Sequence, residues 1–219
     1  MAVVPTISAD ILGLLGIVIL LSALYMQGQT FVDPTIRAIS IQSFMLTTLF
    51  SVLFVQSGDL NLLYLAGVTA VVRGVLIPTV MLRQVQAFRH SLRETGTAQR
   101  IPSLVILGVI MVIGGYAVFR AVLLPILPNP LISVPFVLLL LGFLLIVTRR
   151  NALMQMTGFL EEENAVLFAG ALIAPSIPLL IEFAVVLDIL GVVLVGVLLS
   201  ATRNVLQTLE APDLEQLSG

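Results

Sequence analysis

Ionisable side chains stand in the middle of apolar stretches of this 219-residue chain. They are Arg73, the consecutive Glu161, Glu162 and Glu163, and Asp188. An ionisable group near the centre of a lipid bilayer costs at least ~2.5–3.5 kcal/mol, so such groups face the interior of a protein and mark proton or ion pathways. A buried carboxyl group beside an arginine is also suited to exchange protons, because burial and the cation act on it in opposite directions. These residues are therefore the candidates for a proton or ion path.

The same residues allow a purely structural interpretation. Arg73 would then neutralise Asp188 or Glu163 so that the helices can pack, without any proton transfer. The sequence leaves both interpretations open. Glu182 lies near the other end of the apolar segment that contains Asp188. There we expect either a solvated residue at the entrance of a path or a helix cap.

The three consecutive glutamates fall within a long apolar stretch. Successive residues of an α-helix are turned by about 100°, so the three carboxyl groups cannot share one face. Glu163 shares its face with Leu167, whereas Glu161 points nearly opposite, so at least one glutamate must face another protein surface or a water-filled cavity. In the alternative, in which 161–164 is a loop, the remaining apolar piece 151–160 is too short to cross a membrane.

Pro78 follows Arg73 by five residues and has no N–H with which to donate to the carbonyl of Gly74. We therefore expect a locally opened helical turn at this point. The arginine would lie close enough to act as a donor for the freed carbonyl.

The composition predicts the elements that must position these residues. Hydrophobic residues make up 59% of the chain and charged residues only 10%, whereas an ordinary soluble domain has roughly 45–50% and 25%. A spanning helix needs about 20 mostly apolar residues, which predicts an all-α integral membrane protein with about seven transmembrane helices. Residues 1–203 would form this single domain, and residues 204–219 an acidic cytoplasmic tail. The expected spans lie near residues 7–27, 36–56, 60–83, 102–124, 131–148, 151–174 and 177–202.

Arginine placement predicts the orientation, because cytoplasmic loops of membrane proteins collect Lys and Arg. We expect a multi-pass chain with the N-terminus outside and the C-terminus in the cytoplasm. The loop 84–101 is either a short interfacial helix or an extension of the third span, and Arg120 lies close to an outer loop. The arginines that fall on the cytoplasmic side are Arg37, Arg83, Arg89, Arg93, Arg100, Arg149, Arg150 and Arg203.

The chain has no cysteine and one histidine, which restricts the cofactors that it can hold. Disulfides, iron–sulfur clusters and thiolate metal sites are excluded. His90 stands alone among loop arginines and cannot supply the paired axial ligands of a membrane haem. We therefore predict no cofactor, no metal and no catalytic residue in this chain, so that any electron transfer takes place on another protein.

The order of elements also favours an internal repeat. Spans 1 to 3 and spans 5 to 7 each consist of an apolar helix, a helix that starts at an arginine, and a helix with a central charge. Gln42 follows Arg37 by five residues, and Gln155 follows Arg150 by five residues. The expected fold is then two three-helix repeats joined by an extra helix.

The last three spans carry a group of residues at recognisable spacings, which are Arg149-Arg150-Asn151-Ala152-Leu153, Gly158-Phe159, Glu163-Asn164, Glu182 and Asp188. With these residues and the spacing of Arg73 and Pro78, the chain resembles component E of the hydrogenase-4 and formate hydrogenlyase group. The last three spans are also similar to subunit K of respiratory complex I and to the small subunit of multisubunit cation/proton antiporters, although subunit K has a glutamate where this chain has Leu160. The resemblance implies the cytoplasmic (inner) membrane of a prokaryote.

This resemblance implies a membrane-arm subunit of an oxidoreductase, with no redox centre of its own, placed between antiporter-like subunits and the part that holds the metal centres. It also implies that Glu163 and Asp188 belong to a proton or sodium path. Two alternatives are a self-sufficient secondary transporter, which would bind its substrate at the midplane between repeats, and a scaffold that seals the interface between larger subunits. All three would contact membrane lipids, and none involves nucleic acid.

Overall fold

The structure, a computed structural model, describes residues 4–87, 100–174 and Gly191. Within these ranges the chain is all-helical, with short turns between the helices and no β-strand. The described helices that are long and apolar enough to cross a membrane are Asp10–Gln27, Val32–Ser57, Leu60–Arg83, Ile101–Leu123 and Pro130–Thr148. They coincide with the first five predicted spans to within a few residues, which confirms the all-α fold class and the membrane-spanning length of these helices.

Several predicted features lie outside the described residues. The predicted seventh span, 177–202, belongs to this group except for Gly191, and so does the predicted acidic tail, 204–219. The single residues concerned are Arg89, His90, Arg93, Glu182, Asp188 and Arg203.

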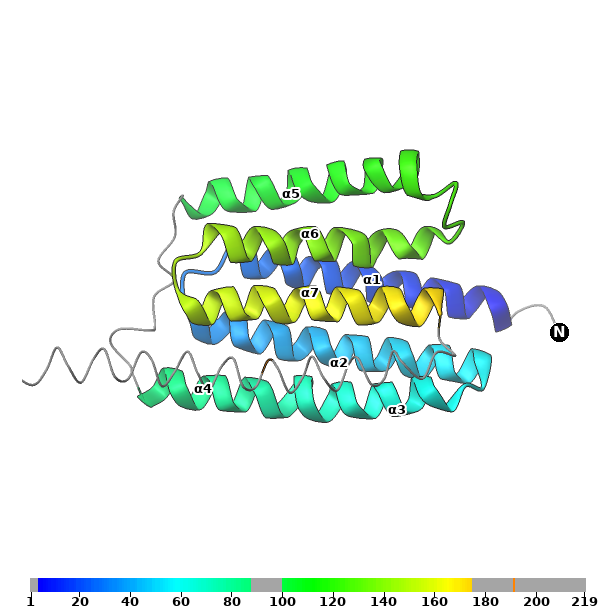
Figure 1. The fold of residues 1–219 in the computed structure, drawn as a ribbon, viewed down its shortest axis with the longest axis horizontal. Coiled ribbons are helices and arrows are strands. Elements are labelled where there is room, and N and C mark those ends of the chain that lie inside the picture. The colour runs from blue at the N-terminus through cyan, green and yellow to red at the C-terminus, as the bar shows by residue number, and fades with distance from the viewer. Residues whose placement is uncertain (1–3, 88–99, 175–190, 192–219) are drawn as a thin grey trace, which may run out of the picture.

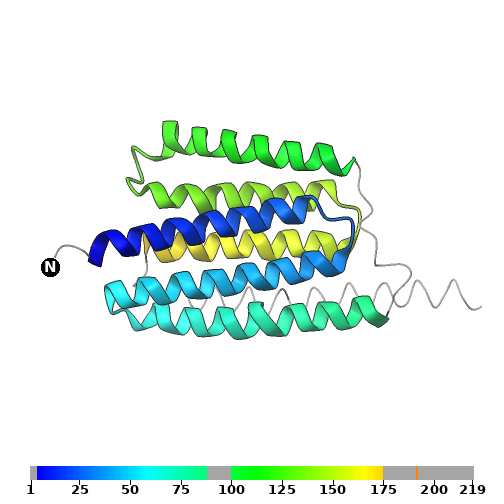
Figure 2. The ribbon, with the colours of Figure 1, turned by 180° about the vertical axis from the view of Figure 1, so that it is seen from behind.

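The described helices form one bundle in which spans that follow one another in the chain run antiparallel (Figure 1). α7 lies between α6 and α2, and α1 lies behind it, as the reverse view in Figure 2 shows. α5 packs beside α6 at one edge of the bundle, and α3 and α4 pack beside α2 at the other. The helices are α1 (Val4–Gln27), α2 (Val32–Ser57), α3 (Leu60–Val68), α4 (Ile77–Ala87), α5 (Ile101–Val118), α6 (Ser133–Thr148) and α7 (Ala152–Ile173).

Two spans contain a π-helical segment, and each segment ends two residues before a proline. They are η1 (Thr69–Leu76), which joins α3 to α4, and η2 (Phe119–Leu123), which ends α5. In each segment an amide donates to the carbonyl five residues earlier, from Ile77 to Val72 and from Leu124 to Phe119. The local sequences are nearly the same, RGVLIP at 73–78 and RAVLLP at 120–125. A proline cannot donate to the carbonyl four residues before it, and both spans widen the preceding turn.

α6 and α7 approach each other closely through glycines. A Cβ atom added at Gly158 would lie 2.8 Å from the carbonyl oxygen of Gly142, and one added at Gly142 would lie 2.9 Å from the carbonyl oxygen of Gly158. Small residues at helix contacts allow backbones to come together in membranes, where van der Waals packing replaces the hydrophobic effect as the driving force. This contact fixes α7 against α6 and thereby positions the charged residues of α7.

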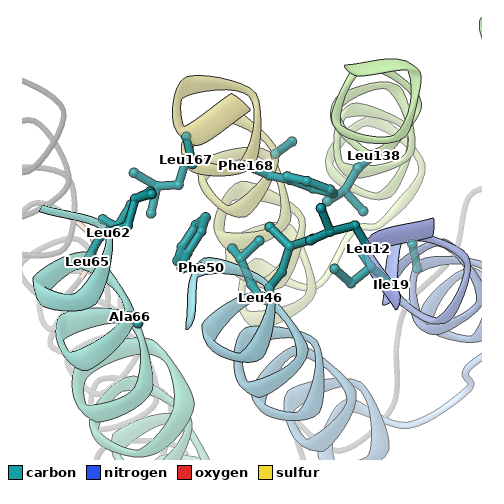
Figure 3. Close-up of a cluster of buried hydrophobic side chains, with 14 of the residues drawn as sticks. Leu12, Ile19, Leu46, Phe50, Leu62, Leu65, Ala66, Leu138, Leu167 and Phe168 are labelled. Carbon is teal, nitrogen blue, oxygen red and sulfur yellow. The ribbon is translucent and has the colours of Figure 1, made fainter. Parts of the chain in front are cut away.

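Buried apolar side chains form two clusters along the bundle. Figure 3 shows the first cluster, in which the Phe50 ring of α2 faces α3 and α7 and the Phe168 ring of α7 faces α1 and α6. The second cluster lies further along the helices and includes Met26, Met81 and Met154. Because the polar residues of α2, η1 and α7 fall between the two clusters in the sequence of each helix, apolar packing closes the bundle above and below them.

One end of the bundle gathers most of the described arginines. The C-terminal ends of α1, α4 and α6 lie there, together with the N-terminal ends of α2, α5 and α7 (Figure 1). We call this the arginine-rich end, because it carries Arg37, Arg83, Arg100, Arg149 and Arg150. Arg120 lies near the opposite end of α5, where it is exposed.

The glutamate run 161–163 lies inside α7, which is helical from Ala152 to Ile173. The alternative in which 161–164 is a loop is therefore wrong. Helix formation is favoured at the start by Asn151, whose side chain accepts a hydrogen bond from the amide of Leu153 at 2.9 Å. The run is tolerated because α7 lies in the middle of the bundle, where more than one face of the helix meets protein.

Candidate functional site

Arg73 and Glu163 form a buried ion pair between η1 and α7. Arg73 Nη2 lies 3.1 Å from Glu163 Oε2, and only 2% and 3% of the two side chains are exposed. Arg73 is thirteen residues from Leu60 and ten from Arg83 in its span, and Glu163 is about as far from either end of α7. At 1.5 Å per residue the pair lies about 15–20 Å from each end of its helices, close to mid-depth. The predicted pairing of these two residues is thus present.

A chain of hydrogen bonds extends the ion pair into α2 and α1. Arg73 Nη1 donates to Asn164 Oδ1 at 3.2 Å, and Asn164 Nδ2 donates to Gln42 Oε1 at 3.0 Å. Gln42 Nε2 in turn donates to Ser22 Oγ at 3.2 Å. The five residues Ser22, Gln42, Asn164, Arg73 and Glu163 form what we call the polar layer, which links four helical segments.

Further hydrogen bonds hold the side chains of the polar layer in one orientation. Asn164 Nδ2 also lies 3.4 Å from Ser43 Oγ, and Ser43 Oγ donates to the carbonyl of Ile39 at 2.9 Å. Gln42 and Asn164 are 0% and 1% exposed. Buried polar networks whose members are bonded to one another impose a single arrangement on the helices that carry them. The layer therefore holds the Arg73 guanidinium in a fixed position beside Glu163.

The widened turn of η1 contributes to the position of Arg73. Gly74 follows Arg73, and its carbonyl receives no hydrogen bond from Pro78, because proline has no N–H. The hydroxyl of Ser40 on α2 donates to this carbonyl instead. A Cβ atom at Gly74 would lie 3.0 Å from the ring of Phe44, so the glycine lets α2 approach at this point. The expected opened turn is present, and Ser40 supplies a donor that the sequence did not reveal.

The other two glutamates of the run lie in different surroundings. Glu161 is 0% exposed, and its carboxyl oxygens have no hydrogen-bond partner among the residues that the structure describes. Burying an ionised carboxylate without a partner is costly, which makes Glu161 a second candidate for a proton-carrying group. Glu162 is partly exposed, and its aliphatic stem lies against Gly142 of α6. Of the three, Glu163 alone has the arginine beside it in the described part of the chain.

Arg149, which the charge pattern assigns to a loop, is 1% exposed. Its guanidinium donates to the carbonyl oxygens of Gln29 at 3.0 Å and Met26 at 3.4 Å, and also to that of Gln27. The last carbonyls of a helix have no partner within the helix and favour a nearby cation. Burial lowers the pKa of Arg149 to about 10, so that it still carries its charge at neutral pH. Arg149 therefore fastens the start of α7 to the end of α1.

One feature of the resemblance and one of the predicted repeat can be located in the structure. Leu160 stands where subunit K has a glutamate, and it is buried, with its Cδ2 atom 4.0 Å from a Cβ atom placed on Gly191. Gln42 and Gln155, which suggested the repeat, differ in environment: Gln42 is buried in the polar layer, whereas Gln155 is exposed and donates to the carbonyl of Arg149 at 2.8 Å. The repeat stays a prediction, because most of its last helix lies outside the described residues.

The polar layer contains residues that the pattern of charges in the sequence does not indicate. The ionisable residues point to Arg73 and Glu163, whereas Ser22, Gln42 and Asn164 are neutral. A signal for them exists in the sequence, because amides in the middle of apolar helices hydrogen-bond across helix interfaces. Among the described residues, no group of three or more His, Cys, Asp or Glu side chains is arranged to hold a metal ion.

Comparisons with known proteins give one distant relative. The chain is similar to the uncharacterized protein Rv0085 of Mycobacterium tuberculosis, with 23% identity over 166 residues. The match covers 74% of this chain and 76% of that protein. No protein-family model and no solved structure matches the chain. The similarity extends over most of both proteins and assigns no activity to either.

Proposed function

We propose that this chain is a subunit of a complex I-like, hydrogenase-linked oxidoreductase of a prokaryotic cytoplasmic membrane, and that its polar layer takes part in moving protons or sodium ions. The observation that carries the proposal is the Arg73–Glu163 ion pair, which lies close to mid-depth among apolar helices of membrane-spanning length. Such a pair is expensive to bury, because the desolvation of both charges offsets much of their attraction. Charged groups in the membrane interior most often mark ion paths.

The residues of the resemblance to hydrogenase-4 component E have defined positions, which supports the proposal. Asn151 caps the start of α7, Gly158 forms the contact with α6, and Glu163 and Asn164 both contact Arg73. These residues thus form one functional unit, in which the cap and the glycine position the helix that carries the acid.

The chemistry that we propose is the gain and loss of a proton by Glu163. The ionised carboxylate is held by Arg73. When Glu163 accepts a proton, the attraction of its carboxyl group for the guanidinium weakens, and Arg73 keeps its hydrogen bond to Asn164. The attraction between the ionised carboxylate and the guanidinium, which is restored when the proton leaves, favours its release. Electron transfer in neighbouring subunits would drive the cycle, because the resemblance implies a subunit with no redox centre of its own.

The finer architecture belongs to the same proposal. We place seven spans in the membrane, with the N-terminus outside and the arginine-rich end in the cytoplasm, following the charge rule for loops. The neighbours would be antiporter-like and other membrane-arm subunits. Asp188 and Glu182 would continue the path in the last span.

The test is ion translocation per electron by the assembled complex in vesicles. In Glu163→Gln the proton-accepting group is lost, and we expect the ratio to fall several-fold while electron transfer continues. Glu162→Gln is the matched control, because Glu162 is the adjacent, partly exposed glutamate. An unchanged ratio in a fully assembled Glu163→Gln complex would reject the coupling role, and the scaffold function would remain as the alternative. Ion transport by the purified chain alone would instead favour a self-sufficient transporter.

A further inference from the structure

A hollow lies between the last turns of α1 and the first turns of α2, near the arginine-rich end, and it is not part of the ion pair. Its volume is about 650 Å³. Aromatic, aliphatic and polar side chains share its lining, with Ser22, Tyr25, Asp33 and Arg37 supplying the polar groups. At ~30 Å³ for each water molecule, the hollow has room for about twenty.

Ser22, a member of the polar layer, is one of the residues that line the hollow. Ser22 lies five residues before the end of α1 at Gln27, which is a depth of ~7.5 Å along the helix. Its hydroxyl donates to the carbonyl of Ile19 at 2.7 Å and accepts from Gln42 Nε2 at 3.2 Å. A hydroxyl oxygen can accept twice, so Ser22 has one acceptor position left for a molecule in the hollow.

The outer part of the hollow also requires a polar occupant. Oδ1 of Asp33 is buried and has no hydrogen-bond partner within the described part of the chain. Buried polar atoms without a protein partner are commonly satisfied by water. A hydrocarbon chain in the hollow would leave Asp33 Oδ1 without a partner, whereas water could donate to it.

We infer that this hollow is filled with water, which reaches the polar layer at Ser22 from the arginine-rich side. The hollow lies beside the apolar cluster around Met26 and Met154, which closes the direct route along the helices. Asp33 is then the carboxyl group at the mouth, and Ser22 is the point at which water meets the chain Gln42, Asn164 and Arg73. This inference rests on the proposed function for its purpose, while water in the hollow can be measured independently.

The chain has no cysteine, so single cysteines can be introduced directly and probed with a charged, membrane-impermeant methanethiosulfonate. We expect Ser22→Cys to react when the reagent is added on the arginine-rich side, within about tenfold of the rate of Thr30→Cys in the exposed loop, because the reactive thiolate forms where water solvates it. Leu21→Cys is the matched control. Leu21 precedes Ser22 and is 58% exposed on the apolar surface of α1, where we expect almost no reaction.

A Ser22→Cys rate as low as that of Leu21→Cys, with Thr30→Cys reactive, would show that lipid fills the hollow and would overturn the inference. Reaction from the opposite side alone would do the same. Since Ser22→Cys alters the polar layer, Ala38→Cys provides a second probe of the same hollow from α2, outside the hydrogen-bond chain. The reaction rates of Ser22→Cys and Ala38→Cys are obtained without any transport measurement. They therefore report on water in the hollow even if the translocation test rejects the proposed function.

Discussion

Arg149 and Arg150 are adjacent in the chain and lie in different surroundings. The guanidinium of Arg149 is buried against the carbonyl oxygens that end α1, whereas Arg150 is exposed. The charge rule for membrane loops treats the two arginines alike. The rule counts charges at a membrane face and does not predict which of the side chains is buried in the protein. Contacts between distant segments of the chain determine which arginine is buried.

Replacing Arg149 tests its role as a cap of α1. Arg149→Ala removes the donors of buried carbonyl groups, and we expect it to lower the free energy of unfolding by about 1.5–3 kcal/mol, the value for hydrogen bonds to charged groups. Arg150→Ala should change it by less than about 0.5 kcal/mol, as surface substitutions do. Reversible unfolding in mixed micelles measures both. Equal effects of the two substitutions would contradict the capping role.

At the scale of elements, the contact between α6 and α7 depends on the absence of side chains at two positions. A Cβ atom at Gly158 would meet the Gly142 carbonyl oxygen at 2.8 Å and the Ile146 amide nitrogen at 3.1 Å. These are backbone atoms, so relief requires the helices to move apart. Because α7 carries Glu163 and Asn164, such a shift also disturbs the polar layer.

We therefore expect Gly158→Ala to lower the free energy of unfolding by about 1–3 kcal/mol, as overpacked interiors do. Gly114→Ala on α5 is the control, since a Cβ atom there meets nothing within 4 Å. It should be neutral or slightly stabilising, because alanine favours the helix. Thermal unfolding of the two variants in the same detergent distinguishes them. A neutral Gly158→Ala would mean that the two helices are further apart than the structure has them.

Much of the helix layout could be predicted from the sequence, because a span of about 20 apolar residues is a property of one segment. The first five spans and the helical glutamate run follow from length alone. The opened turn before Pro78 was also predictable, since proline lacks an amide donor. The sequence could not reveal that Ser40 fills the freed position, or that Gln42 joins Asn164. Such contacts depend on the rotation of each helix toward its neighbours, and helices this apolar have only a weak polar face to indicate it.

For the whole molecule, the polar layer lies between two apolar clusters, the first around Phe50 and Phe168 and the second around Met26 and Met154. An ion at Glu163 is therefore closed off along the bundle axis. A purely structural pair and a functional pair would look alike in this arrangement. Both could be replaced by apolar residues with little loss of stability, and they differ in whether ion translocation is lost when the two charges are removed together.

The central claim is that Arg73 and Glu163 are paired inside the bundle, and a double-mutant cycle of unfolding free energies tests it most directly. Arg73→Met and Glu163→Leu should each cost about 3–5 kcal/mol, because each leaves one charge buried alone. The double variant should regain at least about 2 kcal/mol relative to the sum of the single effects, a size found for residues in contact. Effects that add to within about 0.5 kcal/mol are typical of distant residues, and they would contradict the pairing.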